Sequence, residues 1–428
     1  MVSNAYRRYV TSLLLVVYVF NQLDRGVFSI LLVPIKQQFQ LTDTQLGFVW
    51  GPALVVLYSC LGVPVARWAD RSRRVWIMSG AIVIWSVVTV LTATVQHFWQ
   101  LALARVAVGV GEAGFSAIAI SVIGDYENDQ NRARAISTFM LAIPISLMLS
   151  DLVGGWVAQW WGWRRVFLMA GLPGIVFTIL MRVTVREPAR RPMVGSSEVT
   201  RPPLKAVLAA LWARRSLRHL ALAQGLANIV ANAIAWVSVF FIRDHGMTTG
   251  ELGTWLAVAE GVGPFVGIWL SGFLAARFAA KDPAVNARFM AYASLAVAPL
   301  ALSMLWCPLK GLALLLYLLL NIPAYYFLGP TQALAQELVG PSMRATTASV
   351  LILVQLLAGG VIGAQIVGVL SDALTPFAGS TAEALRWAMA LGSMFTLWAA
   401  LHFWLAGKHI RGDLAAVRGE PLPVPSVA

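Results

Sequence analysis

The stretch Tyr9–Ile35, YVTSLLLVVYVFNQLDRGVFSILLVPI, governs how the rest of the sequence is interpreted. It is mostly apolar and exceeds the about 20 residues that an α-helix needs to cross a bilayer. Its centre nevertheless holds Asn21, Gln22, Asp24 and Arg25. Ionised groups there cost at least about 2.5–3.5 kcal/mol each, so they persist where they face a bundle interior or a water-filled cavity. We predict that the remaining helices surround this pair.

Asp24 and Arg25 are neighbours in sequence, but successive residues on a helix point about 100° apart and do not face each other. We therefore expect each to meet a partner on another helix. Intramembrane charge favours a functional role. The alternative is a structural pair in which acid and base only neutralise each other.

The composition is that of a polytopic membrane protein. Of 428 residues, 59% are hydrophobic and 12% charged, and the mean hydropathy is +0.73, whereas soluble proteins carry about 25% charged residues. The net charge of +13 is explained better by basic loops between spans than by nucleic-acid binding. The first apolar segment is too long for a signal peptide and lacks a cleavage site, so we interpret it as a retained helix.

Catalytic and metal-binding motifs are missing from the sequence. The cysteines Cys60 and Cys307 form no disulfide framework or metal-ligand spacing. There is no HExxH motif, no nucleotide-binding loop and no serine nucleophile elbow. We therefore predict no enzyme activity, no cofactor and no metal. A receptor, a membrane enzyme and an ATP-driven pump are all disfavoured.

The apolar pattern predicts an all-α membrane protein with twelve transmembrane helices in two pseudo-symmetric six-helix bundles. The bundles comprise residues 1–185 and 216–410, with a linker at 186–215 and a tail at 411–428. The spans lie near 9–34, 44–66, 75–95, 99–124, 133–158, 164–184, 218–242, 251–275, 287–307, 311–335, 343–371 and 385–407.

Basic residues predict the orientation of the spans. They gather at the N-terminus, in alternate loops, in the central linker and in the tail, which places both termini in the cytoplasm. The opposite loops are poorer in base, with Lys36 and Lys310, and Arg164-Arg165 is the exception. We expect an integral protein of a bacterial inner membrane.

The two halves look like copies of one another. Asp125 and the later pair Arg132-Ala133 follow the fourth span, and Glu337 and Arg344-Ala345 follow the tenth at the same spacing. Paired six-helix halves with a site at their interface are typical of secondary transporters.

Three local motifs carry a family resemblance. They are Asp70–Arg74 (DRSRR), Arg105–Gly109 (RVAVG) and the glycine- and tryptophan-rich junction Gly154–Arg164. With the internal repeat, they resemble the major facilitator superfamily over essentially the whole chain. Ala66 stands where the loop motif usually opens with Gly, and Ala276 replaces the acid in its second copy.

Within that superfamily the chain most resembles the spinster-like branch. The matching pieces are Asn21–Arg25 (NQLDR) and Val110–Gly114 (VGEAG), with Leu172–Gly174 and Val183–Pro188. Anion–cation symporters of sugar acids also carry Asp-Arg in the first span, and they remain the alternative.

The fourth span adds the residues for proton coupling. Arg105 and Glu112 are seven apart and share a helix face, with Gly109 between them. We hypothesise that Asp24 and Glu112 take up and release a proton, while Arg25 or Arg105 binds an anionic substrate group through its fork of donors. A static pair that locks spans one and four is the alternative.

Uncharged polar residues are expected to line the same cavity. Gln224, Asn228 and Asn232 form a stripe along span seven, and Asn21 and Tyr325 are further substrate-binding candidates. Hydrogen bonding between helices explains the stripe equally well.

Two other sets of charged residues have separate roles. The resemblance implies that Asp70, Arg71 and Arg74 hold cytoplasmic helix ends together in one conformation; topogenic charge is the alternative. For Asp151 in span five we predict packing or local hydrogen bonding. Glu260 in span eight receives no role.

These observations predict a secondary active transporter that works by alternating access and is driven by the proton gradient. The spinster-like resemblance implies an amphipathic organic anion as substrate, such as a lysophospholipid or a sphingoid phosphate. The symporter resemblance implies a small sugar acid or an aromatic carboxylate. A facilitative pore without ion coupling is the alternative from another class. We expect a monomer whose partners are its substrate and membrane lipids, with no nucleic acid.

Overall fold

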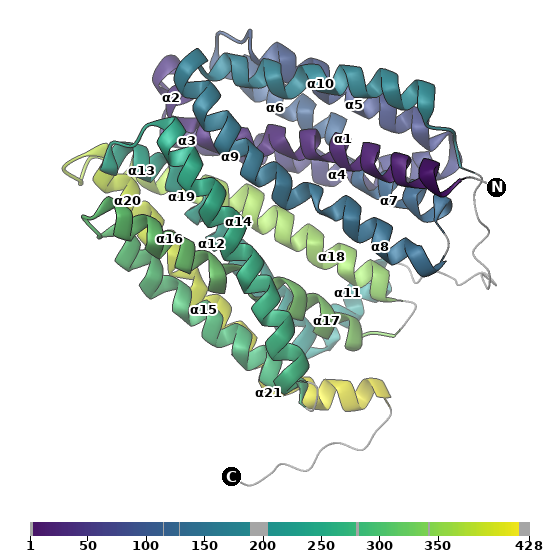
Figure 1. Cartoon of the computed structure of the whole chain (residues 1–428). Coiled ribbons are helices and arrows are strands. Elements are labelled where there is room, and N and C mark those ends of the chain that lie inside the picture. The colour runs from purple at the N-terminus through teal and green to yellow at the C-terminus, as the bar shows by residue number, and fades with distance from the viewer. Residues whose placement is uncertain are drawn as a thin grey trace. The chain divides into compact units, whose positions relative to one another are not determined.

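The computed structural model describes residues 3–113, 115–127, 129–188, 204–279, 282–340 and 343–418. Within these ranges the chain is helical and contains no β-strand. It divides into two compact units (Figure 1): unit 1 is Met1–Val194 with Trp236–Gly261, and unit 2 is Gly195–Ala235 with Val262–Ala428.

Unit 1 is a bundle whose central helix is α1. Its core is apolar and includes Val17, Met78, Trp85, Phe115 and Phe139. The helices are α1 (Asn4–Ile30), α2 (Leu32–Phe39), α3 (Asp43–Trp50), α4 (Pro52–Arg71), α5 (Arg74–Thr92), α6 (Phe98–Glu112), α7 (Phe115–Tyr126), α8 (Asp129–Met140), α9 (Ala142–Trp161), α10 (Trp163–Thr184), α13 (Val237–His245) and the first part of α14 (Thr249–Leu274).

Unit 2 has its own core, which includes Leu217, Leu220, Ala287, Phe403 and Ile410. Besides the rest of α14, it comprises α11 (Leu204–Ala213), α12 (Arg215–Ile234), the π-helical segment η1 (Ala275–Ala279), α15 (Pro283–Leu305), α16 (Lys310–Tyr325), α17 (Leu328–Glu337), α18 (Arg344–Leu356), the π-helical segment η3 (Leu357–Gly363), α19 (Ala364–Leu374), α20 (Thr381–Ser393) and α21 (Phe395–Arg418).

The described residues contain twelve helical stretches long and apolar enough to cross a membrane, which confirms the predicted number of spans. Several spans consist of two helices. Gly51, followed by Pro52, separates α3 from α4, because proline has no N–H to continue the hydrogen bonding of α3.

Helix ends differ from the sequence prediction at two places. The last span was expected to end at residue 407 and a tail to begin at 411, but α21 continues to Arg418. Tertiary contacts hold this extension, since Asp413 accepts hydrogen bonds from Ser216, and Arg411 donates to Asp282. Within the predicted linker, α11 forms at its end, and residues 189–203 lie outside the described ranges.

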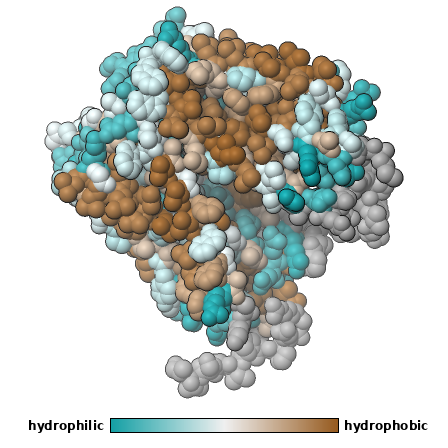
Figure 2. All heavy atoms as spheres, viewed as in Figure 1, coloured by the Kyte–Doolittle hydropathy of each residue, from teal (hydrophilic) through white to brown (hydrophobic). Residues whose placement is uncertain are grey.

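The surface of unit 1 fits a lipid environment. Figure 2 shows hydrophobic residues over the middle of the helices of this unit and hydrophilic residues towards their ends. On α10, large apolar side chains point outward: Val176, Ile179 and Val183 are 63%, 62% and 80% exposed. Apolar side chains that face outward in the middle of a helix are expected where hydrocarbon replaces water.

Candidate functional site

The first ion pair of the site joins α1 to α6 and is fully enclosed. Arg105 donates from Nη1 to Asp24 Oδ2 at 3.1 Å, and Thr89 on α5 donates from Oγ1 to Asp24 Oδ1 at 3.2 Å. Asp24 is 0% exposed and Arg105 1%. The guanidinium of Arg105 also lies over the ring of Phe28, 4.4 Å from its centroid. Both oxygens of Asp24 are therefore occupied.

The second ion pair joins the same two helices and is more open. Arg25 donates from Nε to Glu112 Oε2 at 2.5 Å, and its Nη2 lies 2.5 Å from the same oxygen. The Arg25 side chain is 23% exposed and that of Glu112 0%. The other oxygen, Oε1, accepts no hydrogen bond from any described residue. The guanidinium stacks on Tyr58 of α4 at 4.2 Å.

Asp24 and Arg25 thus meet partners on another helix rather than each other, as predicted from the turn of the helix. The two pairs differ in what they can do. Asp24 and Arg105 bind each other, are contacted by two further side chains, Thr89 and Phe28, and are buried. Arg25 binds one oxygen of Glu112 and leaves the second without a partner among the described residues, and the Arg25 side chain is partly exposed.

Close packing of α6 against α4 and α5 explains the position of Glu112. A Cβ on Gly109 would lie 2.4 Å from the carbonyl oxygen of Leu54, and one on Gly111 would lie 2.7 Å from the backbone nitrogen of Trp85. These glycines let α6 approach α4 and α5 closely. The helix ends at Glu112, where its last carbonyls make the surroundings unfavourable for a negative charge. Arg25 offsets this effect.

The polar stripe of α12 lies in unit 2, where it packs against the α18–η3 span. Gln224 donates to Gln355 Oε1 at 2.8 Å, while Asn228 and Asn232 donate to backbone carbonyls one turn earlier, at 3.2 and 3.0 Å. A Cβ on Gly359 would lie 2.5 Å from Nδ2 of Asn232. The Gln224–Gln355 bond joins two helices, as the alternative expects, whereas the bonds of Asn228 and Asn232 stay within α12. A substrate role for the stripe stays a prediction.

Two further predicted residues occupy different units. Asn21 on α1 is 2% exposed, and its Nδ2 has no hydrogen-bond partner among the described residues. Tyr325 is the last residue of α16 in unit 2 and is half-buried. Their roles as substrate ligands also stay predictions.

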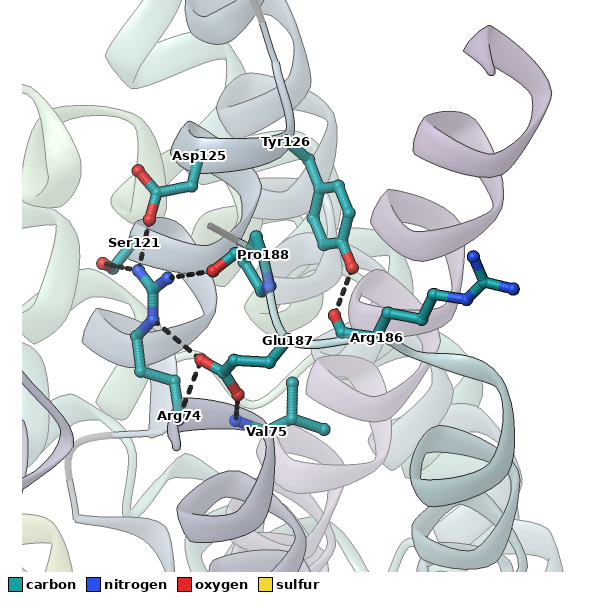
Figure 3. A network of polar contacts seen from close by, with 8 residues as sticks. All are labelled: Arg74, Val75, Ser121, Asp125, Tyr126, Arg186, Glu187 and Pro188. Atoms are coloured by element: carbon teal, nitrogen blue, oxygen red, sulfur yellow. Dashed lines mark hydrogen bonds and ion pairs between the residues drawn. The ribbon is translucent and has the colours of Figure 1, made fainter. Parts of the chain in front are cut away.

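Arg74, one of the three predicted gating residues, is the centre of a polar network in unit 1 (Figure 3). Its Nη1 donates to Asp125 Oδ2 at 2.5 Å and to Ser121 at 2.9 Å, and its Nη2 donates to the carbonyl of Pro188 at 3.3 Å. Glu187 accepts from Nε of Arg74 at 3.3 Å. The network ties the start of α5 to the end of α7 and to the segment after α10.

Glu187 also caps α5, because it accepts from the backbone nitrogens of Arg74 and Val75, both at 3.0 Å. Nearby, Tyr126 donates to the carbonyl of Arg186. Of the other predicted gating residues, Arg71 is exposed, and the side chain of Asp70 lies outside what the structure describes. The gating role of all three stays a prediction.

Sequence reasoning missed Thr89 and Tyr58. Threonine and tyrosine in apolar spans are too common to stand out, and α4 and α5 carry no charge near them. Only tertiary packing brings the hydroxyl of Thr89 to Asp24 and the ring of Tyr58 to Arg25. Among the described residues, no group of three or more His, Cys, Asp or Glu side chains could hold a metal ion.

The profile of the Major Facilitator Superfamily matches residues 14–364. A protein of Mycolicibacterium smegmatis described as an MFS-type efflux pump is 31% identical over 92% of this chain and 91% of its own length. Human protein spinster homolog 1 is 30% identical over 58% of this chain and 44% of its length. A sphingosine-1-phosphate transporter of Danio rerio is 28% identical over 53% and 46%. The chain thus spans less than half the length of these two animal relatives.

Among solved structures, a bacterial homolog of the human lysosomal transporter spinster, crystallised in an inward-facing and unoccupied conformation, superimposes with a TM-score of 0.89. The two sequences are 28% identical, and the match covers 96% of this chain and 99% of that one.

Proposed function

The chain belongs to the Major Facilitator Superfamily and to its spinster-like branch, and we propose that it is a proton-coupled transporter of an amphipathic organic anion. It is an integral membrane protein. The family consists of transporters, not of enzymes. The proton coupling, the substrate, an inner-membrane location, cytoplasmic termini and a monomeric state are parts of the proposal.

One observation carries the proton coupling: Glu112 holds Arg25 through a single oxygen, while its other oxygen is free among the described residues. A proton on Glu112 removes the charge that holds Arg25. The guanidinium of Arg25, whose side chain is partly exposed, then becomes available to an anionic group. The proton thus strengthens the binding of the anion. Because coupling between two binding events is reciprocal, the anion also strengthens the binding of the proton.

The surroundings of Arg25 favour an amphipathic substrate. The guanidinium presents a fork of donors that suits phosphate and carboxylate groups, and Tyr58 and Tyr18 supply aromatic surface beside it. The sphingosine-1-phosphate transporter among the relatives supports a phosphate next to an apolar chain. The enclosed pair of Asp24 and Arg105 has the smaller exposure and serves to hold α1 against α6 in this proposal.

The test is anion binding at two pH values. Purified protein is screened by thermal shift with a lysophospholipid, a sphingoid phosphate, a sugar acid and an aromatic carboxylate. We expect an amphipathic phosphate to bind more tightly at the lower pH. In Glu112→Gln, binding should be equally tight at both values, because the amide cannot hold Arg25 by charge. Glu251→Gln, which removes an acid at the start of α14, is the matched control and should behave as wild type.

Transport in proteoliposomes then separates the remaining possibilities. An imposed pH gradient should drive uptake of the bound anion in the wild type and not in Glu112→Gln. Unchanged pH dependence in both Glu112→Gln and Asp24→Asn would remove the coupling role. Transport that ignores the gradient would indicate a facilitative pore, and a response to sugar acids alone would identify the other substrate class.

A further inference from the structure

Asp151 is an acid on α9 that the proposed coupling site does not use. It is 2% exposed, and its Oδ2 has no hydrogen-bond partner among the described residues. An ionised carboxylate in such a place is costly unless it is paired. The prediction of packing or local hydrogen bonding for Asp151 leaves this oxygen unexplained.

Close packing brings α14 against α9 at this residue. A Cβ on Gly253 would lie 2.1 Å from the carbonyl oxygen of Asp151, and one on Gly261 would lie 3.2 Å from Cγ of Met148. Later residues of α14 thus meet earlier residues of α9, so the two helices run antiparallel. The contact lies wholly within unit 1.

This geometry directs Glu260 towards Asp151. Glu260 is seven residues after Gly253 and therefore lies on the same face of α14, the face packed against α9. Side chains on a helix lean towards its N-terminus. Because α9 and α14 are antiparallel, the side chains of Asp151 and Glu260 lean towards one another.

Three basic groups of the same unit bind other acids. Arg25 and Arg105 bind Glu112 and Asp24, and Arg243 of α13 binds Asp43. Glu260, which is half-buried, is the acid that the packing of α14 brings to the side of α9 that carries Asp151. On α8, α10, α13 and the start of α14, the other charged or titratable groups whose side chains the structure describes are Arg132, Arg134, Arg164, Arg165, Arg182, Asp244, His245 and Glu251.

We infer that Asp151 and Glu260 form a second proton-binding site, in which the two carboxyl groups hold one proton between them. Two carboxylates that face each other in a low-dielectric interior cannot both ionise, so one proton stays with the pair. The site lies beside the α1–α9 contact, where Ser150 donates to the carbonyl of Leu23 at 3.1 Å. It goes beyond the proposed coupling at Glu112 and does not depend on it.

The test uses infrared spectroscopy of purified full-length protein in a detergent that contains no carbonyl group. All variants carry Glu112→Gln, so that a proton on Glu112 contributes nothing. At neutral pH the parent should show the C=O band of a protonated carboxyl, shifted in D₂O. In the variant that also carries Asp151→Asn, the area of this C=O band should fall by the contribution of one carboxyl group. Adding Glu251→Gln, on the same helix as Glu260, should leave the band unchanged.

Glu260→Gln provides a second, independent readout. Removing the like charge should lower the pH at which the band titrates by about one unit or more, which is typical of coupled carboxyls. The inference fails if Asp151→Asn leaves the band area intact, or if Glu260→Gln leaves its titration unmoved. It also fails if sodium chloride, compared with choline chloride, abolishes the band in the parent, because the pair would then bind sodium. None of these results bears on Glu112.

Discussion

At Glu112, the end of α6 and the guanidinium of Arg25 act in opposite directions on one carboxylate. The helix end disfavours its charge, and Arg25 stabilises it. A group balanced in this way responds to small changes in its surroundings. Asp24 is different, because Arg105 and Thr89 bind both of its oxygens. In the proposed mechanism, Glu112 therefore carries the exchangeable proton and Asp24 has a structural role.

Removal of Arg105 should destabilise the protein strongly. Arg105→Gln leaves Asp24 buried without its cation, and breaking a buried ion pair from one side costs about 3–5 kcal/mol. The double variant Asp24→Asn/Arg105→Gln should recover much of the loss, because no unpaired charge remains. Unfolding temperatures in detergent measure both. Equal destabilisation by the single and double variants would contradict the importance of this pair.

Thr89 should act as a positioning residue for Asp24. Thr89→Val has the same shape but removes the donor, and hydrogen bonds to charged groups contribute about 1.5–3 kcal/mol. We expect a lower unfolding temperature, while Thr89→Ser, which retains the hydroxyl, should remain close to wild type. A valine variant as stable as the serine variant would show that the bond to Oδ1 contributes little.

At the scale of the helices, close contact depends on glycines that leave room for a neighbouring backbone. Gly109 packs against α4 and Gly111 against α5. A Cβ atom added to Gly80 on α5 would have no atom of another element within 4 Å. The same residue type therefore has different roles on adjacent helices, and the sequence alone does not tell them apart.

Gly109→Ala should separate α6 from α4. Its Cβ would lie 2.4 Å from the carbonyl oxygen of Leu54, which cannot move aside as a flexible side chain would. Overpacking of this kind costs about 1–3 kcal/mol. Gly80→Ala is the matched control and should be neutral or stabilising, since alanine favours helix by about 0.8–1 kcal/mol. Thermal unfolding of the two variants checks the order.

Asp282, which caps α15, gives a pH-dependent contact between elements of unit 2. Hydrogen bonds from Arg411 hold the pKa of Asp282 below its ordinary value. A lowered pKa contributes stability above the ordinary value of about 3.9, and that stability is lost as the pH falls through the lowered one. The difference in unfolding temperature between wild type and Arg411→Gln should therefore shrink on acidification. A difference that stays constant would contradict this assignment.

For the whole molecule, the distribution of basic residues predicts that both termini and the central linker face the cytoplasm. On a background with Cys60 and Cys307 replaced by Ala, Thr200→Cys should react with a membrane-impermeant maleimide in inside-out vesicles. Leu309→Cys, between the ninth and tenth spans and 64% exposed, should react in right-side-out vesicles. The reverse pattern would invert the topology.

The sequence by itself determined that this is a twelve-span transporter whose first span carries Asp24 and Arg25. The hydrophobic length of a helix and a local motif are properties of short stretches of chain, so they can be predicted from the sequence alone. Which charged side chains pair with one another cannot be predicted in this way. Asp24 could have met either Arg105 or an uncharged partner, and the choice followed from how α1, α5 and α6 pack.

Only the tertiary structure decided which carboxylate is closed and which is open, that Tyr58 supports Arg25, and that α14 packs closely against α9 at Asp151. Each of these facts depends on residues far apart in sequence. The bilayer constrains how apolar a helix must be, but it does not constrain which of its faces meets which neighbour. That choice depends on the fit of side chains at each helix contact.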